Sequence, residues 1–493
     1  MPIMLAIDQS TSATKALLFD QNASLIDQAS LSHRQIYPQP GWVEHDAGEI
    51  YANTLAVIRS LLEKNPDRVE DLLCLSLTNQ RETFVLFDRR TGEPLYNAIV
   101  WQCRRGEKVC AGLAAAGDEE PVHRATGLKI DTYFPASKLR WLLDERPDLG
   151  RRLAVGSALF GTMDTYLIYR LTGGQVYATD HTNASRTLFY DIETLDWSPD
   201  LCRLFGASFA RLPEIRESAA CFGETTLEGL LPRPLPIAGV MGDSQAALFA
   251  QRCFTPGSAK VTFGTGSSLL LNLGAQKKLS SSGVVTAIGW VLNGQPTYAF
   301  EGITNFTGAT IAWLRDQLQL IRDPAETEAL ARSVPDNGGV YLVPAFVGLS
   351  APYWRPDVRA AISGLTPSST RAHVVRAALE SIAYVVTDAL RSMEQEAGLP
   401  LQMVHADGGA VRNAFLMQFV ADINGKSVRA SHLPELSALG AVFSGGLGMK
   451  AYASLEDLNR IPIGFTTYAP LMARSQVEAH YAGWQHAVRQ VLA

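Results

Sequence analysis

The sequence is poor in cysteine and has no cysteine pattern typical of metal binding. Its 493 residues include six cysteines, which lie far apart, with no CxxC pair and no nearby histidine partner: Cys74, Cys103, Cys110, Cys202, Cys221 and Cys253. Disulfide frameworks and zinc sites need ligands at characteristic close spacings. We therefore expect reduced thiols, as in a cytoplasmic protein.

A concentrated charge of one sign is also missing. The formal net charge of −6 is spread along the chain without a basic block. Nucleic acids and anionic membranes are bound by basic patches, so neither is expected as a partner. An anionic substrate would need a local site, because the overall charge does not attract it.

No long apolar segment opens the chain. The first residues, MPIMLAIDQS, contain no basic segment, and their apolar run stops at Asp8. These features argue against a secretory signal and a membrane span here, and predict a cytoplasmic protein with no membrane insertion.

The chain also lacks a low-complexity linker and a repeat of about 20 to 50 residues. Strand-like and helix-like segments alternate throughout instead, which predicts an α/β protein. A hydrophobic content of 47% and a charged content of 19% are typical of a well-packed soluble protein. The length exceeds one ordinary hydrophobic core, so two domains are expected.

Three segments carry clear periodicity. Asp46 can cap a helix over 46–63, with Glu49 three residues later and an apolar face at helical spacing. Residues 72–78, LLCLSLT, are typical of a buried strand. Residues 372–393, rich in Ala and Val, predict a long buried helix.

Residues 5–19, LAIDQSTSATKALLF, place a polar turn between two apolar strands. Its hydroxyls and backbone N–H groups can cradle phosphate oxygens. Asp8 at the strand end suits Mg²⁺, which takes few carboxylates, and Lys15 supplies a positive charge. The alternative is an ordinary polar hairpin turn.

The same pattern recurs at 259–273, AKVTFGTGSSLLLNL, again as strand, short polar turn and strand. Two copies near the head of two similar halves suggest a duplicated domain and favour the phosphate-binding interpretation. The boundary is expected near 250–257, which gives domains 1–252 and 253–493.

Two further turns are candidates for the site. In VHADGGAVRN, Gly408 and Gly409 precede a helix-like run and permit close approach of a ligand to the backbone, although a plain strand-to-helix turn explains them too. Asp243 follows the apolar strand 237–241 and precedes a helix. Open α/β sheets place their chemistry at such strand ends, which makes Asp243 the candidate base. The same position also suits a helix N-cap.

The residues resemble the FGGY carbohydrate kinases and, within them, the glycerol kinases. The resemblance covers nearly the whole chain and is carried by seven stretches: YPQPGWVEHD (37–46), TNQRET (78–83), NAIVWQCRR (97–105), YFPASKLRWL (133–142), DTYLIYRLTGG (164–174), TNASRT (182–187) and AISGLTPSSTRAHVVRAALE (361–380).

The resemblance implies two ribonuclease-H/actin-like ATPase domains, each a βββαβαβα unit, with ATP and Mg²⁺ in the cleft between them. It assigns the nucleotide to seven positions, namely Thr11, Ser12, Lys15, Thr265, Gly308, Gly409 and Asn413. It assigns the polyol to Arg81, Glu82, Tyr133, Asp243 and the adjacent Ser244, with Trp101 as a packing wall. Asp243 would accept the hydroxyl proton during phosphoryl transfer, with Asp8 near the metal. Family members commonly form dimers or tetramers.

Two departures concern the substrate pocket. Ser244 stands where glycerol kinases have Gln, and Ser268 stands where they have Phe. Both changes enlarge the pocket, so a four- or five-carbon polyol or ketose is an alternative to glycerol. Lys15 also replaces the usual Arg and lacks its bidentate fork. A different class of function, an ATP-gated clamp related to actin and chaperone ATPases, conflicts with the residues assigned to the polyol.

Overall fold

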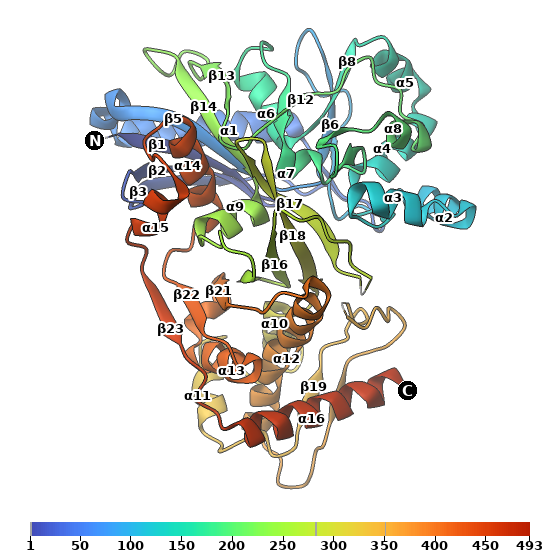
Figure 1. Ribbon diagram of the computed structural model, residues 1–493, viewed down its shortest axis with the longest axis vertical. Coiled ribbons are helices and arrows are strands. Elements are labelled where there is room, and N and C mark those ends of the chain that lie inside the picture. Colours follow the sequence, from blue (N-terminus) through green and yellow to red (C-terminus); the bar gives the residue numbers. More distant parts are fainter. Residues whose placement is uncertain (1, 282, 351) are drawn as a thin grey trace.

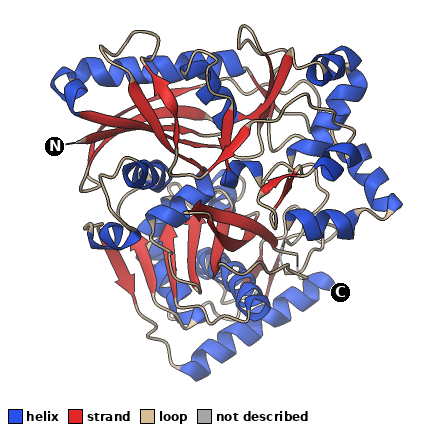
Figure 2. Ribbon diagram, turned by 45° about the horizontal axis from the view of Figure 1, so that its top comes forward, coloured by secondary structure: helices blue, strands red, loops and turns tan. Residues whose placement is uncertain are grey.

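Two β-sheets of similar strand order organise the chain (Figures 1 and 2). The structure is a computed structural model that describes residues 2–281, 283–350 and 352–493. The first sheet has the order β13 (Cys221–Thr225), β14 (Leu235–Gly242), β5 (Leu72–Asn79), β1 (Ile3–Gln9), β2 (Ala13–Asp20) and β3 (Leu25–Ser32). The second has the order β17 (Val285–Leu292), β18 (Gln295–Thr304), β16 (Ser267–Gly274), β15 (Ser258–Phe263), β21 (Met403–Asp407), β22 (Val428–Ser431) and β23 (Phe465–Tyr468).

The strand directions repeat from one sheet to the other. In the first sheet the β1–β2 hairpin is antiparallel, β1 runs parallel to β5, and β5 runs parallel to β14. In the second sheet β15 pairs antiparallel with β16 and parallel with β21, which in turn runs parallel to β22. The duplicated hairpin and the two actin-like domains expected from the sequence are confirmed.

Strand β1 is apolar on both faces because a helix covers each one. Ile3, Leu5 and Ile7 pack in the cluster formed with helix α1 (Ala47–Lys64). Met4 and Ala6 point the other way, into the cluster that contains helix α14 (Leu436–Gly448). The alternation follows from the two-residue period of a strand. Figure 1 shows α14, near the end of the chain, beside the strands that begin it.

The predicted periodic segments form as expected. Asp46 caps α1, where its carboxylate accepts hydrogen bonds from the backbone N–H groups of Gly48 and Glu49. Strand β5 covers the run predicted at 72–78. We call the part of the structure built on the first sheet the first body and the part built on the second sheet the second body. Helix α12 (Arg371–Ala397) includes the predicted 372–393 and is largely buried in the second body. It lies among α10 (Gly308–Asp316), α11 (Glu326–Arg332), α13 (Ala414–Asn424) and α16 (Arg474–Leu492).

A third, smaller sheet extends the first body. It has the order β4 (Glu44–His45), β7 (Ala98–Ile99), β6 (Phe84–Asp88) and β8 (Ala158–Thr162). Short pairs form between β9 (Ala178–Asp180) and β12 (Glu214–Arg216), between β10 (Tyr190–Asp191) and β11 (Asp196–Trp197), and between β19 (Tyr341–Val343) and β20 (Ala361–Ser363). The remaining helices are α2 (Glu107–Ala116), α3 (Glu119–Thr126), α4 (Pro135–Glu145), α5 (Pro147–Ala154), α6 (Met163–Leu171), α7 (His181–Ala184), α8 (Pro199–Leu204), α9 (Asp243–Ala250) and α15 (Leu455–Arg460), with 3₁₀ turns at Pro66–Asp71 and Gly409–Arg412.

All six cysteines are unpaired in the structure. Within the described ranges, no helix combines the length and the apolar character that a membrane crossing requires.

Candidate active site

The candidate polyol and metal residues meet at one edge of the first sheet. Asp8 lies near the end of β1, Arg81 and Glu82 follow β5, and Asp243 follows β14 as the first residue of α9. Strands β1, β5 and β14 are parallel neighbours, so their carboxyl ends share an edge. The fold thereby brings together residues that are more than 200 positions apart in the sequence.

Arg81 orients the candidate base. Its Nε forms an ion pair with Asp243 Oδ1 at 3.0 Å, while Nη1 donates to Gln245 Oε1 at 3.1 Å. Nη2 contacts Glu301 Oε1, on strand β18, at 2.7 Å. The Arg81 side chain is 5% exposed and that of Asp243 is 40% exposed. The buried Arg81 therefore holds one carboxylate oxygen of Asp243, while the rest of that group remains accessible to a substrate.

A second buried arginine completes this network. Arg186 Nε contacts Glu82 Oε1 at 2.5 Å, and Nη1 contacts Glu301 Oε2 at 2.6 Å. Burial alone would raise the pKa of Glu301, but Arg186 and Arg81 outweigh it and lower that pKa to about 2. The network therefore joins both bodies through paired charges.

Sequence reasoning assigned no role to Arg186 or Glu301. Arg186 lies inside one of the stretches that carry the family resemblance, 182–187, and Glu301 interrupts the apolar strand residues YAFEGI. A carboxylate within an otherwise buried strand is costly unless it is paired, and this is the signal that identifies Glu301.

Trp101 and Tyr133 form one wall beside this network. Their ring centroids lie 5.4 Å apart, and Trp101 Nε1 donates to Thr11 Oγ1 at 3.0 Å. The buried Lys138 amine donates to the carbonyl oxygens of Val100, Trp101 and Tyr133 at 3.2, 3.4 and 3.0 Å. Lys138, which sequence reasoning also missed, thus fixes the two segments that carry the aromatic rings.

The first hairpin turn leaves its hydroxyls accessible to solvent. Thr11 is partly exposed and Ser12 is exposed. Lys15 Nζ lies 2.7 Å from Glu435 Oε2, on the residue that precedes α14. Glu435 was not singled out by the sequence, since its partner is 420 positions away.

The second hairpin turn packs against the start of α10. The Gly264 carbonyl accepts from Gly308 N–H, and the Thr265 carbonyl accepts from Thr307 and Ala309 N–H, each at 3.0 Å. Only glycine fits at 308, because a Cβ there would lie 2.7 Å from the Gly264 carbonyl oxygen. Thr265 uses its backbone carbonyl in these contacts, and the residue is exposed to solvent.

The third predicted turn lies next to the second hairpin. Gly408 has a φ of +93°, and a Cβ there would lie 2.4 Å from the Phe263 carbonyl oxygen, while Gly409 faces open space. Asn413 caps α13 by accepting from Leu416 N–H, and its amide donates to Thr327 Oγ1 at 3.1 Å. The backbone at Gly409 is thus accessible, and the Asn413 side chain has structural partners.

The two small residues of the predicted pocket face each other across the two bodies. Ser244 Oγ on α9 lies 3.2 Å from Ser268 Oγ on β16. The buried Lys260 amine donates to Thr262 Oγ1 at 2.8 Å and lies 3.5 Å from Ser268 Oγ. A larger side chain at either position would therefore contact or displace the side chain at the other.

Asp8 is a buried carboxylate near the end of β1. Burial raises its pKa to about 7, with Lys15 acting in the opposite direction and Asp243 and Glu435 adding to the rise. No cluster of three or more His, Cys, Asp or Glu side chains in the described part of the chain is arranged to hold a metal ion. Mg²⁺ is commonly held by one or two carboxylates together with substrate phosphates and water, so Asp8 and Asp243 fit this metal.

The chain is similar to known proteins over nearly its whole length. Residues 3–250 match the N-terminal domain of the FGGY family of carbohydrate kinases, and residues 259–449 match its C-terminal domain. The chain is 47% identical over 489 residues to the glycerol kinase of Desulfitobacterium hafniense, covering 99% of each chain. It is 46% identical to glycerol kinase 1 of Thermotoga maritima, again over 99% of each chain. The crystal structure of Plasmodium falciparum glycerol kinase with ADP matches it with a TM-score of 0.96 at 36% identity, covering 100% of this chain and 99% of that one.

Proposed function

The chain belongs to the FGGY family of carbohydrate kinases, and we propose that it transfers the γ-phosphoryl group of ATP to a primary hydroxyl of glycerol, giving glycerol 3-phosphate. The observation that carries this proposal is the half-exposed Asp243 carboxylate held at 3.0 Å by a buried Arg81. Full-length similarity to proteins named glycerol kinase supports the choice of polyol. Family membership favours a kinase over an ATP-gated clamp.

In this reaction Asp243 accepts the proton of the attacking hydroxyl, a general-base contribution of roughly 10²–10⁴-fold. Arg81 holds the carboxylate in position, and Glu82 and Arg81 offer an acceptor and donors to the polyol hydroxyls. Trp101 and Tyr133 pack against its carbon chain. Closure of the two bodies excludes water, which otherwise competes as the phosphoryl acceptor.

The nucleotide lies between the two hairpin turns in this proposal. Its phosphates contact Thr11, Ser12 and Lys15 from one body and Thr265 from the other, and the nucleoside side lies near Gly308, Gly409 and Asn413. Asp8, with Asp243 nearby, would hold Mg²⁺, which would neutralise the charge of the phosphate oxygens. Lys15 must exchange its contact with Glu435 for a phosphate oxygen.

We divide the chain into domains 1–252 and 253–493. The family matches, which end at 250 and begin again at 259, support this division. Helix α14 belongs to the second segment of sequence but covers the first sheet, so it links the two domains. We propose a cytoplasmic homodimer or homotetramer, which size-exclusion chromatography with light scattering tests directly.

A larger polyol or ketose is the second candidate substrate, and one observation favours it. Ser244 and Ser268 make a contact between two small side chains where the glycerol kinases have Gln and Phe. An under-filled pocket loses on the order of 1–3 kcal/mol per missing methylene-sized contact. A four- or five-carbon substrate would regain those contacts.

The test is steady-state kinetics with glycerol, erythritol, threitol, xylitol and ketopentoses, on the parent and on the double variant Ser244→Gln plus Ser268→Phe. Under the second candidate, the parent prefers a longer substrate and the double variant shifts preference toward glycerol by about 10–200-fold. The effect of the double variant should exceed the sum of the single variants, because the side chains touch. A parent that prefers glycerol tenfold or more over all the others establishes the first candidate. ATP turnover without any dependence on added polyol would contradict both.

A further inference from the structure

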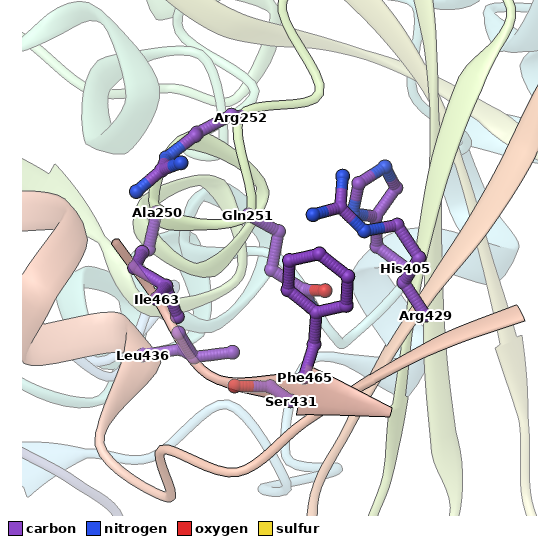
Figure 3. A pocket seen from close by; sticks show the side chains of 9 residues that line it. All are labelled: Ala250, Gln251, Arg252, His405, Arg429, Ser431, Leu436, Ile463 and Phe465. Carbon is purple, nitrogen blue, oxygen red and sulfur yellow. The ribbon is translucent and has the colours of Figure 1, made fainter. Parts of the chain in front are cut away.

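A second pocket lies away from Asp243, at the other end of helix α9. It forms where the end of α9 meets strands β21, β22 and β23, and it encloses about 40 Å³ (Figure 3). Its polar walls come from Gln251, Arg252, His405, Arg429 and Ser431, and Phe465 lies at its rim, 41% exposed. None of the residues assigned to the polyol or the nucleotide lines it.

The strand register gathers basic side chains on this face of the second sheet. His405 on β21 is the register partner of Lys260 on β15 and of Arg429 on β22. Partners on neighbouring strands point to the same face about 4.8 Å apart. The three residues therefore form one row, which runs from Ser268 of the substrate pocket, through Lys260, to the second pocket.

Arg252 adds a further cation from the opposite wall. Its two terminal nitrogens donate to the carbonyl oxygens of Asn459 and Ile461 at 3.1 and 2.5 Å, so the guanidinium is held in place by neutral groups. Its Nε is buried and has no hydrogen-bond partner. The Arg429 guanidinium carbon lies 3.5 Å from the centroid of the Phe465 ring, in a cation–π contact that also leaves its charge unneutralised.

No carboxylate is paired with these cations in the described part of the chain. Neither Arg252 nor Arg429 forms an ion pair there, and His405 has no hydrogen-bonded partner. Asp407 is on the same face as His405, but it accepts from Gln251 and its charge is offset by Lys260. Two half-buried guanidinium groups without a counter-charge are unfavourable unless an anion from solution joins them.

The electrostatics of the pocket agree with this geometry. Burial, Arg429 and Arg252 together lower the pKa of His405 to about 4. Burial and the nearby Arg429 also lower the pKa of Arg252, to about 10. Each cation therefore disfavours the charge of its neighbours, and a bound anion would reverse these effects.

We propose that this pocket binds a small tetrahedral oxyanion, either inorganic phosphate or the phosphate of a monoester. A volume of about 40 Å³ holds roughly three water-sized spheres, which suits one phosphate group. Arg429 and Arg252 supply the charge, and Ser431 and Gln251 are the neighbouring hydroxyl and amide. The open rim at Phe465 leaves room for the remainder of a monoester.

The position of the pocket gives such an anion contacts with both bodies. Helix α9 carries Asp243 at its first residue and is followed directly by Gln251 and Arg252. Strand β21 carries His405 and leads to Gly409. A bound oxyanion therefore joins the helix of the candidate base to the strand of the candidate nucleotide turn.

Isothermal titration calorimetry of the full-length protein with inorganic phosphate tests the proposal. The titrations contain a saturating non-hydrolysable ATP analogue, so that the hairpin turns are already occupied. Arg429→Gln should weaken phosphate binding at least about tenfold, because a charge-assisted contact is lost. The controls Lys15→Gln, at the first hairpin, and Arg474→Gln, at an exposed position on α16, should bind phosphate like the parent. Glycerol 3-phosphate titrated in parallel into the parent and Arg429→Gln distinguishes a free phosphate from a monoester, because only binding that depends on Arg429 reports on this pocket and not on the product site.

A second measurement guards against a misfolded variant. Phosphate should raise the melting temperature of the parent and of Arg474→Gln, and should raise that of Arg429→Gln much less, while His405→Asn, which keeps both arginines, retains the shift. Phosphate binding that is unchanged in a folded Arg429→Gln protein, or that disappears in Lys15→Gln instead, would overturn the proposal. The same holds if the parent binds neither ligand.

Discussion

Arg81 and Asp243 come from different parts of the sequence. Asp243 helps to compensate the buried charge of Arg81, and Arg81 fixes the position of Asp243. A buried guanidinium needs compensating charge, which Glu301 and Asp243 supply at 2.7 and 3.0 Å. In return, Asp243 has one oxygen fixed while the carboxylate remains 40% exposed. A carboxylate that is both fixed in position and accessible suits the role of general base.

At the residue scale we predict that Asp243→Asn retains the fold and ATP binding but loses at least about 10²-fold in turnover. The amide can still accept from Ser244 N–H, as the carboxylate does, and Arg81 keeps its contact with Glu301. Steady-state kinetics and ATP titration calorimetry check both parts. Asp200→Asn, at an exposed position, serves as a control. Turnover of Asp243→Asn within tenfold of the parent would refute the role of Asp243 as general base.

At the scale of elements, helix α14 depends on glycine to approach its neighbours. A Cβ at Gly440 would lie 1.9 Å from the Ala246 carbonyl oxygen of α9, and one at Gly445 would lie 2.4 Å from the Ala238 carbonyl oxygen of β14. The helix therefore packs directly against the backbone that delivers Asp243. It also follows Glu435, which holds Lys15.

We predict that Gly440→Ala lowers the free energy of unfolding by about 1–3 kcal/mol, because a methyl group has no space and α14 must shift. Gly112→Ala on α2, where nothing lies within 4 Å, should be neutral or stabilising by up to about 1 kcal/mol. Denaturant titration of both variants measures the difference. Equal effects of the two substitutions would contradict the close approach of α14 to α9.

At the scale of the whole molecule, buried acids couple stability to pH. Asp164, fully buried at the start of α6, has its pKa raised to about 7 by burial and by the nearby Asp180. An aspartate in the unfolded chain has a pKa of about 3.9. Between these values the native state keeps a proton that the unfolded state has released, so the contribution of Asp164 to stability falls as pH rises.

We therefore predict that Asp164→Asn becomes more stable relative to the parent as pH rises from 5 to 8, by up to about 1.4 kcal/mol per pH unit near pH 5–7. The neutral amide oxygen can still accept from Thr179, as the carboxylate does. Denaturant titrations of both proteins across this pH range give the difference directly. Asp67→Asn, at an exposed position, is the control, and a difference that does not change with pH would show that Asp164 is ionised in the native state.

The sequence alone determined the elements whose signals are local. Alternation and helical spacing predict β5, α1 and α12, and the two polar turns between apolar runs predict both hairpins and their duplication. Asp243 is likewise a candidate from the sequence, because it directly follows a strand, whereas Arg81 and Glu82 are candidates through the family resemblance. The tertiary structure alone decided which distant residues complete the site. Arg186, Glu301 and Glu435 act through partners 104 to 420 positions away. The packing of α14 on the first sheet and the cross-strand row from Lys260 to Arg429 depend on register and helix docking, which arise from long-range contacts that no local pattern encodes.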